Sequence, residues 1–181
     1  MGKELETRII NINVDHMRSK LKDLNAKLVK SEDQINDIYD FEDGRLLKNK
    51  GYARIRTIND KLNNKEIIFM TTKKMLSQGK FKEMEENEVI VDNKIMAEGI
   101  FKALGLKLHQ SIKKYRESYK LLDGLVEIDI NDKDFCPFPY IEIETSSEES
   151  LDNMLKLLGY SMKDTTSKTI YELIDEYNKN K

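Results

Sequence analysis

Residues 3–12 read KELETRIINI, and this stretch begins a charge pattern that recurs along the chain. Successive side chains of a strand point to opposite faces of the sheet, so Glu4, Glu6 and Arg8 share one face and Leu5 lies on the other. The alternation is typical of a strand with one apolar face and one polar face. It leaves open whether the charged face points outward to bulk solvent or inward.

The same arrangement, two like charges flanking an apolar or aromatic residue, occurs in five more strand-like segments. Two positions along a strand span about 6.6 Å, where like charges repel by roughly 2–3 kcal/mol at an effective dielectric constant near 20. The segments are residues 54–56 (RIR), 83–85 (EME), 114–116 (KYR), 127–129 (EID) and 142–144 (EIE). Because acidic and basic pairs lie on different segments, a sheet would gather them into two separate clusters.

The composition limits the classes of protein to which the chain can belong. The chain has 181 residues, of which 31 are basic and 33 acidic, giving a net charge of −2. We therefore expect one domain over residues 1–181 and no bias toward nucleic acid. The single Cys136 excludes an internal disulfide framework. With no apolar signal segment and no run long enough to span a bilayer, we expect a soluble, cytoplasmic protein.

The order of expected elements mixes helices and strands. Met17, Leu21, Leu24 and Leu28 have helical spacing after Asp15, which could cap the helix. Further helices are expected at residues 92–105, where Asp92 would be the cap, 147–159 and 167–179. Strand-like segments are 3–12, 34–41, 51–58, 66–72, 80–86, 107–121, 125–130 and 140–146. This order predicts an α+β fold.

Two arrangements could accommodate the repeated charge pairs. In one, an antiparallel sheet carries cross-strand ion pairs on its solvent face. In the other, a closed antiparallel barrel has its apolar side chains outward beneath helices and its charges inward, lining a wet tunnel. Such a tunnel is costly unless a polyanion and a cation fill it. Six such pairs in one chain favour the tunnel.

A triphosphate with a divalent metal has the chemistry that such a tunnel requires. Glu4, Glu6, Glu142 and Glu144 offer the hard oxygen ligands that Mg²⁺ or Mn²⁺ prefers. Arginine and lysine donate charge-assisted hydrogen bonds to phosphoryl oxygens. The sequence has no Walker-type glycine-rich loop and no G-x-G-x-x-G motif, so side chains would have to hold the phosphates.

The ordered motifs resemble those of the CYTH superfamily, or triphosphate tunnel metalloenzymes, over nearly the whole chain. The opening ELETR is similar to the family's E-x-E-x-K strand, with Arg8 where lysine is usual. Later segments that resemble family motifs are RIR, MTTK, KEMEE, KKYRESY, LVEIDI and PYIEIE, in that order. The final TSKTIYELI is similar to the C-terminal helix of short bacterial cyclase-like members.

The resemblance implies a closed antiparallel barrel of about eight strands with helices outside, and a role for each matching residue. The metal ligands would be Glu4, Glu6, Asp129, Glu142 and Glu144, with Mg²⁺ or Mn²⁺ as cofactor. Glu4, Glu6, Arg8 and Glu144 would be catalytic. The phosphates would be held by Arg8, Arg54, Arg56, Lys73, Lys114 and Arg116, with Glu83 and Glu85 completing the substrate site. The strand register leaves open Lys74 in place of Lys73 and Lys113 in place of Lys114.

The resemblance also implies an activity. Class IV adenylate cyclases convert ATP to cyclic AMP and pyrophosphate, and the length and C-terminal segment favour this branch. The alternative is a triphosphatase acting on inorganic triphosphate, thiamine triphosphate or nucleoside triphosphates. A third alternative, a module that binds polyphosphate without catalysis, is disfavoured by the acidic residues. The expected partner is a triphosphate-bearing small molecule, without nucleic acid or membrane, and a homodimer is left open.

Overall fold

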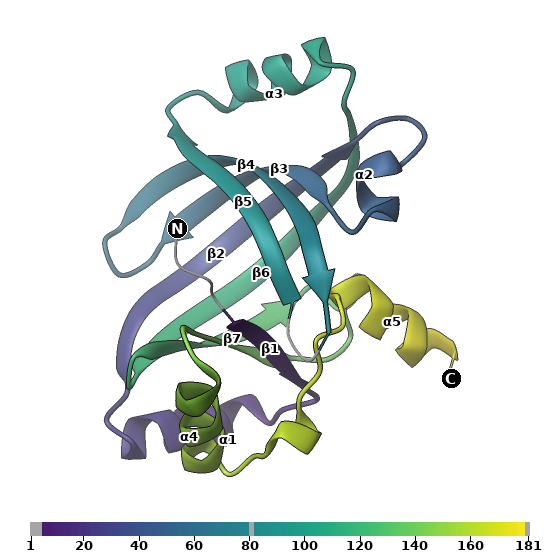
Figure 1. Ribbon diagram of the computed structural model, residues 1–181. Coiled ribbons are helices and arrows are strands. Elements are labelled where there is room, and N and C mark those ends of the chain that lie inside the picture. The colour runs from purple at the N-terminus through teal and green to yellow at the C-terminus, as the bar shows by residue number, and fades with distance from the viewer. Residues whose placement is uncertain (1–4, 80–81, 180–181) are drawn as a thin grey trace. The chain divides into compact units, whose positions relative to one another are not determined.

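The computed structural model describes residues 5–79 and 82–179, which form eight strands, five α-helices and one 3₁₀ turn (Figure 1). The strands are β1 (Leu5–Ile10), β2 (Lys27–Asp40), β3 (Tyr52–Asp60), β4 (Lys65–Gln78), β5 (Lys82–Val91), β6 (Lys107–Leu121), β7 (Gly124–Asn131) and β8 (Tyr140–Thr145). The helices are α1 (Val14–Asp23), α2 (Arg45–Lys48), α3 (Lys94–Ala103), α4 (Glu148–Leu158) and α5 (Ile170–Lys179), and the 3₁₀ turn spans Met162–Asp164.

The eight strands form one antiparallel sheet, which confirms the predicted α+β class. Hydrogen-bonded neighbours follow the order β1-β5-β4-β3-β2-β6-β7-β8. β8 also pairs with β1, at six register positions from Leu5 opposite Thr145 to Ile10 opposite Tyr140. The described pairing of β1 with β5 has one position, Glu6 opposite Lys82. The first strand thus pairs with the last one.

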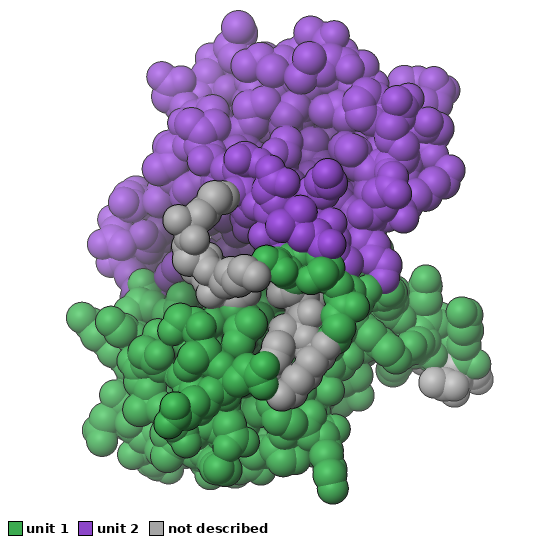
Figure 2. All heavy atoms as spheres, viewed as in Figure 1, with its two compact units in different colours: residues 1–29, 77–83, 117–181 green, residues 30–76, 84–116 purple. Residues whose placement is uncertain are grey.

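The chain divides into two compact units, coloured green and purple in Figure 2. Unit 1 comprises residues 1–29, 77–83 and 117–181, and unit 2 comprises residues 30–76 and 84–116. Strands β2, β4, β5 and β6 contribute residues to both units.

The core of unit 1 lies between its helices and one face of β7 and β8. Ile128, Ile141 and Ile143 are fully buried and pack with Leu151 of α4 and Leu21 of α1. Ser147 caps α4 by accepting a hydrogen bond from the Ser150 backbone, and Gly159 ends it with a left-handed φ of 85°. Because the isoleucines face the helices, the alternate residues of both strands lie on the opposite face of the sheet.

The core of unit 2 also lies between a helix and one face of the strands. Ala97 and Phe101 of α3 pack against Tyr39, Ala53 and Ile55 of β2 and β3. The rings of Tyr39 and Phe101 lie 5.2 Å apart between centroids. Since Ala53 and Ile55 face α3, the arginines that alternate with them in β3 lie on the other face. In both units, therefore, the charged faces of these strands are turned away from the helices of the core.

Several predicted boundaries were wrong for local reasons. Asn13, rather than Asp15, caps α1 by accepting a hydrogen bond from the His16 backbone. Asn93, rather than Asp92, caps α3 in the same way. Leu28 has helical spacing with the residues before it but belongs to β2, because α1 ends near the left-handed Asn25. No helix in the described part of the chain is long and apolar enough to cross a membrane.

Candidate metal and phosphate sites

The strand register of unit 1 places the charged residues of β1, β8 and β7 in two neighbouring rows. Glu142 of β8 lies opposite Arg8 on one side and opposite Glu127 on the other. In the next row, Glu144 lies opposite Glu6. The register therefore brings together charged residues from the two ends of the chain.

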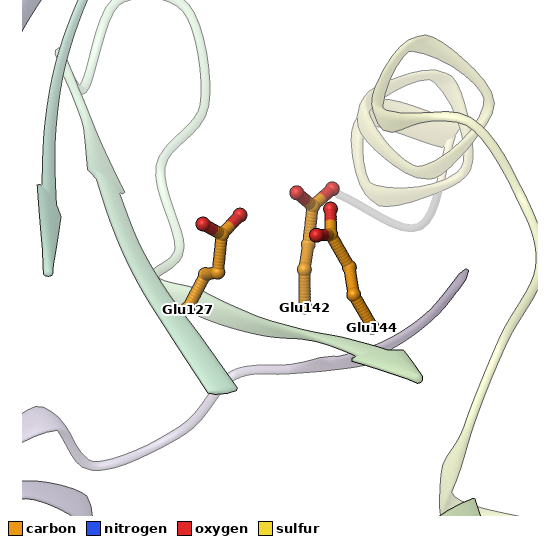
Figure 3. A group of neighbouring side chains, drawn as sticks. All are labelled: Glu127, Glu142 and Glu144. Carbon is orange, nitrogen blue, oxygen red and sulfur yellow. The ribbon is translucent and has the colours of Figure 1, made fainter. Parts of the chain in front are cut away.

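Three carboxylates from these rows converge (Figure 3). Glu127, Glu142 and Glu144 each offer an oxygen, and the three oxygens lie within 4.8 Å of one another. Glu127 is 1% exposed and Glu142 is 6% exposed. The Ser118 hydroxyl donates a hydrogen bond of 2.7 Å to Glu127 and fixes that carboxylate. Uncompensated burial of several carboxylates is unfavourable, so a positive group is expected beside them.

Arg8 supplies a positive charge at this group. It is 8% exposed and forms ion pairs with Glu142 and, at 2.6 Å, with Glu6. Its guanidinium also donates to the Lys168 carbonyl at 2.8 Å. Burial alone would lower the pKa of Arg8, but Glu142 and Glu6 outweigh it and raise this pKa above its usual value. Arg8 is therefore held charged in the interior of unit 1.

The three-carboxylate group fits a hard divalent cation. Mg²⁺ takes oxygen ligands at about 2.0–2.1 Å, so oxygens on one ion lie no more than about 4.2 Å apart. The observed spacing limit of 4.8 Å requires only small side-chain movements to reach that geometry. All donors are carboxylate oxygens, which suit Mg²⁺ or Mn²⁺ better than softer metals. Among the residues that the structure describes, Glu127, Glu142 and Glu144 would hold the ion.

The predicted metal ligands correspond to this group only in part. Glu142 and Glu144 belong to it and Glu6 lies in the adjacent row, whereas Glu4 lies outside the described residues. Asp129 is fully buried on the same face of β7, but it lies opposite Tyr140 rather than a carboxylate. Glu127 was not predicted as a ligand. The sequence contains an indication of it, since the EID segment has two acidic residues on one face of the strand. Only the register with β8 shows which of the two joins the group.

Unit 2 carries a second charged group, on β3, β4 and β5. Arg54 lies opposite Thr71 in the register, and the next pair on this face is Tyr52 opposite Lys73. The basic side chains pair with two glutamates of β5: Lys73 and Arg54 contact Glu86 at 3.2 and 3.3 Å, and Arg56 contacts Glu88 at 3.0 Å. The Thr71 hydroxyl donates to Glu88 at 2.7 Å.

The arginines of this group are crowded and incompletely bonded. Burial lowers the pKa of Arg56, and the positive charges of Arg54 and Arg116 lower it further against the opposing effect of Glu88. The Nε atoms of Arg54 and Arg56 are buried and find no hydrogen-bond partner among the described residues. Buried donors without an acceptor are unfavourable, so this face suits an anionic ligand.

The remaining predicted residues are placed as follows. Lys73 is half-buried on the arginine face and Lys74 is exposed, which agrees with the register assumed for this strand. Lys114 and Arg116 share a face of β6, where Arg116 is 9% exposed, while Lys113 is exposed.

The glutamate pair predicted for the substrate site in β5, Glu83 and Glu85, stays a prediction. Glu83 accepts a hydrogen bond from Ser77 at 3.4 Å, and Glu85 is exposed. Two further glutamates of β5 contact the arginines: Arg54 donates to Glu86 and Arg56 donates to Glu88. Segment 82–88 has glutamates at both odd and even positions, so alternation alone could not choose between the two pairs.

These features define a class of protein: an eight-stranded antiparallel sheet with one carboxylate group suited to a divalent cation and one arginine face suited to phosphate. The particular family follows from a comparison with family models. The model of the CYTH domain matches residues 2–170, and the chain belongs to the CYTH domain family. The members of this family are typically enzymes that process triphosphates.

Solved structures share the fold at low sequence identity. The PH1012 protein of Pyrococcus horikoshii is 24% identical, with a TM-score of 0.76 over 94% of this chain and 98% of that one. An adenylate cyclase candidate from Vibrio parahaemolyticus is 14% identical, with a TM-score of 0.74 over 96% and 98% of the two chains. HpAC1 from Hippeastrum, an adenylyl cyclase candidate described as having a dominant triphosphatase activity, is 18% identical, with a TM-score of 0.65 over 88% of each chain. The chain has no significant match among curated proteins.

Proposed function

We propose that this chain is a metal-dependent enzyme that processes a triphosphate within a closed barrel tunnel. The observation that carries the proposal is the convergence of Glu127, Glu142 and Glu144. A module that only bound polyphosphate would need basic residues alone, and three converging carboxylates would repel its ligand. Carboxylates that hold a cation instead support chemistry at phosphorus.

The residues of the chain divide between two tasks in this proposal. Glu127, Glu142 and Glu144 hold Mg²⁺ or Mn²⁺, and Glu6 and Arg8 complete that end of the site. A bound ion neutralises phosphate charge and polarises the phosphorus under attack. The phosphoryl oxygens accept hydrogen bonds from a basic set of residues: Arg8, Arg54, Arg56, Lys73, Lys114 and Arg116. The unsatisfied Nε atoms of Arg54 and Arg56 support this assignment.

The first candidate reaction is cyclisation of ATP. The ribose 3′-oxygen attacks the α-phosphorus, the bond from that phosphorus to the bridging oxygen breaks, and pyrophosphate leaves with cyclic AMP as the other product. The hydroxyl proton passes to solvent or to a carboxylate. The likeness of length and C-terminal segment to cyclase-like members supports this reaction.

The second candidate is hydrolysis of a triphosphate. Water attacks a terminal phosphorus, the bond from that phosphorus to the bridging oxygen breaks, and phosphate and the corresponding diphosphate leave while a water proton passes to solvent or to a carboxylate. The substrate is inorganic triphosphate, thiamine triphosphate or a nucleoside triphosphate. The dominant triphosphatase activity described for HpAC1, which shares this fold, supports hydrolysis as the second candidate reaction. The same carboxylates and basic residues would serve both reactions, which differ in the nucleophile and in the phosphorus attacked.

One experiment tests the proposal and separates the two reactions. The full chain is incubated with ATP, inorganic triphosphate or thiamine triphosphate, with Mg²⁺, with Mn²⁺ or with excess chelator, and cyclic AMP, pyrophosphate and phosphate are quantified. Cyclic AMP with equimolar pyrophosphate indicates the cyclase, and phosphate without cyclic AMP indicates the triphosphatase. Metal-dependent binding of triphosphates without any product would overturn the enzyme proposal and leave a binding module.

A further inference from the structure

Helix α3 is apolar on two opposite sides. One side buries Ala97 and Phe101, each 2% exposed, against β2 and β3. The other side presents Ile95, Met96 and Ile100, which are 77%, 64% and 49% exposed. A helix that is apolar all round is normally covered all round. The described part of this chain covers only one side of α3.

The exposed apolar residues are concentrated at this helix. Seven of the thirteen exposed large apolar side chains among the described residues lie within residues 89–108. Besides the three on α3, they include Leu104 at its end and residues of the adjoining strand ends: Val89, Ile90 and Leu108. Single exposed apolar side chains are ordinary, whereas a concentration of them marks an interaction surface.

Gly99 lies in the middle of α3 on the same outward side. A glycine within a helix costs about 0.5–1 kcal/mol relative to alanine. A Cβ atom added to Gly99 would meet no described atom within 4 Å, so packing inside this chain does not require glycine there. A missing side chain on an outward helix face allows another backbone to approach closely. Ala103, one turn later, also has a small side chain and lengthens the stretch of helix that another backbone could approach closely.

The charges beside the apolar side are self-complementary. Glu98 and Lys102 lie on one flank of α3, 3.7 Å apart at their charged atoms. Two copies of the helix packed antiparallel about a two-fold axis bring identical flanks together in reversed order. With the crossing near Gly99 and Ile100, Glu98 of each copy then lies beside Lys102 of the other. Opposite charges at such flanking positions favour one partner and one orientation.

We propose that α3 is a homodimer interface, in which Ile95, Met96, Gly99, Ile100 and Ala103 pack antiparallel against the same residues of a second copy. The interface is independent of the triphosphate reaction. A flank with both charge signs suits pairing with itself, whereas adsorption to an anionic lipid surface would call for a basic flank.

Sedimentation velocity over a wide range of protein concentrations tests the interface. The full-length chain is expected to dimerise reversibly, and Ile100→Lys and Met96→Lys are each expected to give a monomer with unchanged far-UV circular dichroism. Leu62→Lys is the matched control, because Leu62 is 47% exposed in the β3–β4 turn, outside the interface. That variant should dimerise like the wild type. A wild-type chain that stays monomeric, or an Ile100→Lys chain that dimerises as the wild type does, would overturn the proposal.

Charge exchange tests the antiparallel orientation. Glu98→Lys makes the flank wholly basic and Lys102→Glu makes it wholly acidic, so each variant alone should dimerise about tenfold more weakly. An equimolar mixture of the two variants should form heterodimers of near wild-type affinity, measured by energy transfer between labelled chains. A mixture no stronger than either variant alone would overturn the antiparallel pairing. Binding of a monomeric wild-type chain to phosphatidylserine vesicles, abolished by Ile100→Lys, would overturn the dimer and assign the surface to lipid.

Discussion

A substitution of Glu144 should weaken metal binding while leaving substrate binding intact. Replacement by glutamine keeps the size of the side chain but removes a charged ligand from the three-carboxylate group. We expect Glu144→Gln to lower turnover by at least about 100-fold, because replacing residues that only hydrogen-bond to metal ligands already costs about 10–100-fold. The increase in melting temperature caused by triphosphate should remain, since the basic residues are intact. Steady-state kinetics and thermal melts measure the two effects.

The control for this substitution is Glu66→Gln, which changes the same chemical group at an exposed position of β4. It should leave turnover and the triphosphate effect unchanged. If Glu144→Gln turned over at the wild-type rate, Glu144 would not be a metal ligand, and the assignment of the carboxylate group would fail.

A substitution of Arg56 tests whether the arginine face binds phosphate or only forms ion pairs on the protein surface. Arg56→Ala removes one or two charge-assisted hydrogen bonds, each contributing about 1.5–3 kcal/mol, so the affinity for triphosphate should fall at least about tenfold. The free protein should be as stable as the wild type or slightly more so, because burial and repulsion from Arg54 and Arg116 disfavour the charged form of Arg56 and lower its pKa. Thermal melts with and without inorganic triphosphate measure both effects.

A surface network predicts the opposite result. Loss of the Arg56–Glu88 ion pair would then cost up to about 1 kcal/mol of stability, with no change in the response to triphosphate. Arg45→Ala serves as the matched control, because Arg45 pairs with Asp43 on an exposed helix turn. An Arg56→Ala chain stabilised by triphosphate as strongly as the wild type would exclude Arg56 from the phosphate site.

The turn into β7 is a point of close packing behind the carboxylates. A Cβ atom at Gly124 would lie 2.5 Å from the Glu144 carbonyl oxygen and 2.7 Å from the Met154 sulfur. Gly124→Ala should therefore lower the free energy of unfolding by about 1–3 kcal/mol, as overpacking does. Urea denaturation measures this change.

Gly79→Ala is the matched control, since a Cβ atom at Gly79 meets nothing described within 4 Å. It should leave the free energy of unfolding within about 0.5 kcal/mol of the wild type. Equal stability of the two variants would show that the β7 turn has room to relax.

The strands also show how far the sequence could predict the site. Alternation correctly placed Glu142 and Glu144 on one face of β8 and Arg54 and Arg56 on one face of β3, because a period of two fixes which residues share a face. It could not supply register between strands. Only the pairing of Glu127 opposite Glu142 brings Glu127 into the carboxylate group.

The same reason explains why the sequence did not indicate Glu86 and Glu88 of β5. Where polar residues occupy both parities, the sequence lacks the apolar alternation that specifies a face. The predictions of where helices begin failed for a different reason. Asparagine and aspartate are both good caps, and residues 13–15 and 92–93 each contain one of both. The helices themselves were predictable, because their apolar periodicity is strong.

Carboxylates with lowered pKa values predict that the protein loses stability in acid. Burial raises the pKa of Glu86, but Lys73 and Arg54 outweigh it and lower this pKa below the usual 4.5. Hydrogen bonds from Asn63 and Ser150 lower the pKa values of Asp60 and Asp123. A lowered pKa in the folded state contributes stability above the unfolded pKa, and this is lost as the pH falls through the folded value.

The melting temperature should therefore be steady near neutral pH and fall as the pH drops below about 4.5. Glu86→Gln should have a shallower fall, because the substituted chain has one carboxylate fewer to protonate on unfolding. Lys73→Met should act in the same direction, since it removes the strongest attraction on Glu86. Melts between neutral pH and about pH 3 measure the slopes. Identical slopes for all three chains would contradict a stabilising role for this ion pair.

The pairing of β1 with β8 also has a consequence for the order in which the protein is made. β1 is synthesised before its six-position partner β8, and the other six strands of the sheet lie between them in the chain. Thr7 reaches even further, to a hydrogen-bond acceptor 159 residues away at Thr166. Contacts of such high sequence separation form slowly, because the intervening chain must be closed into a loop. During synthesis the edge of β1 that pairs with β8 therefore stays unpaired until β8 has followed, and an unpaired strand edge leaves a nascent chain open to aggregation and to chaperones.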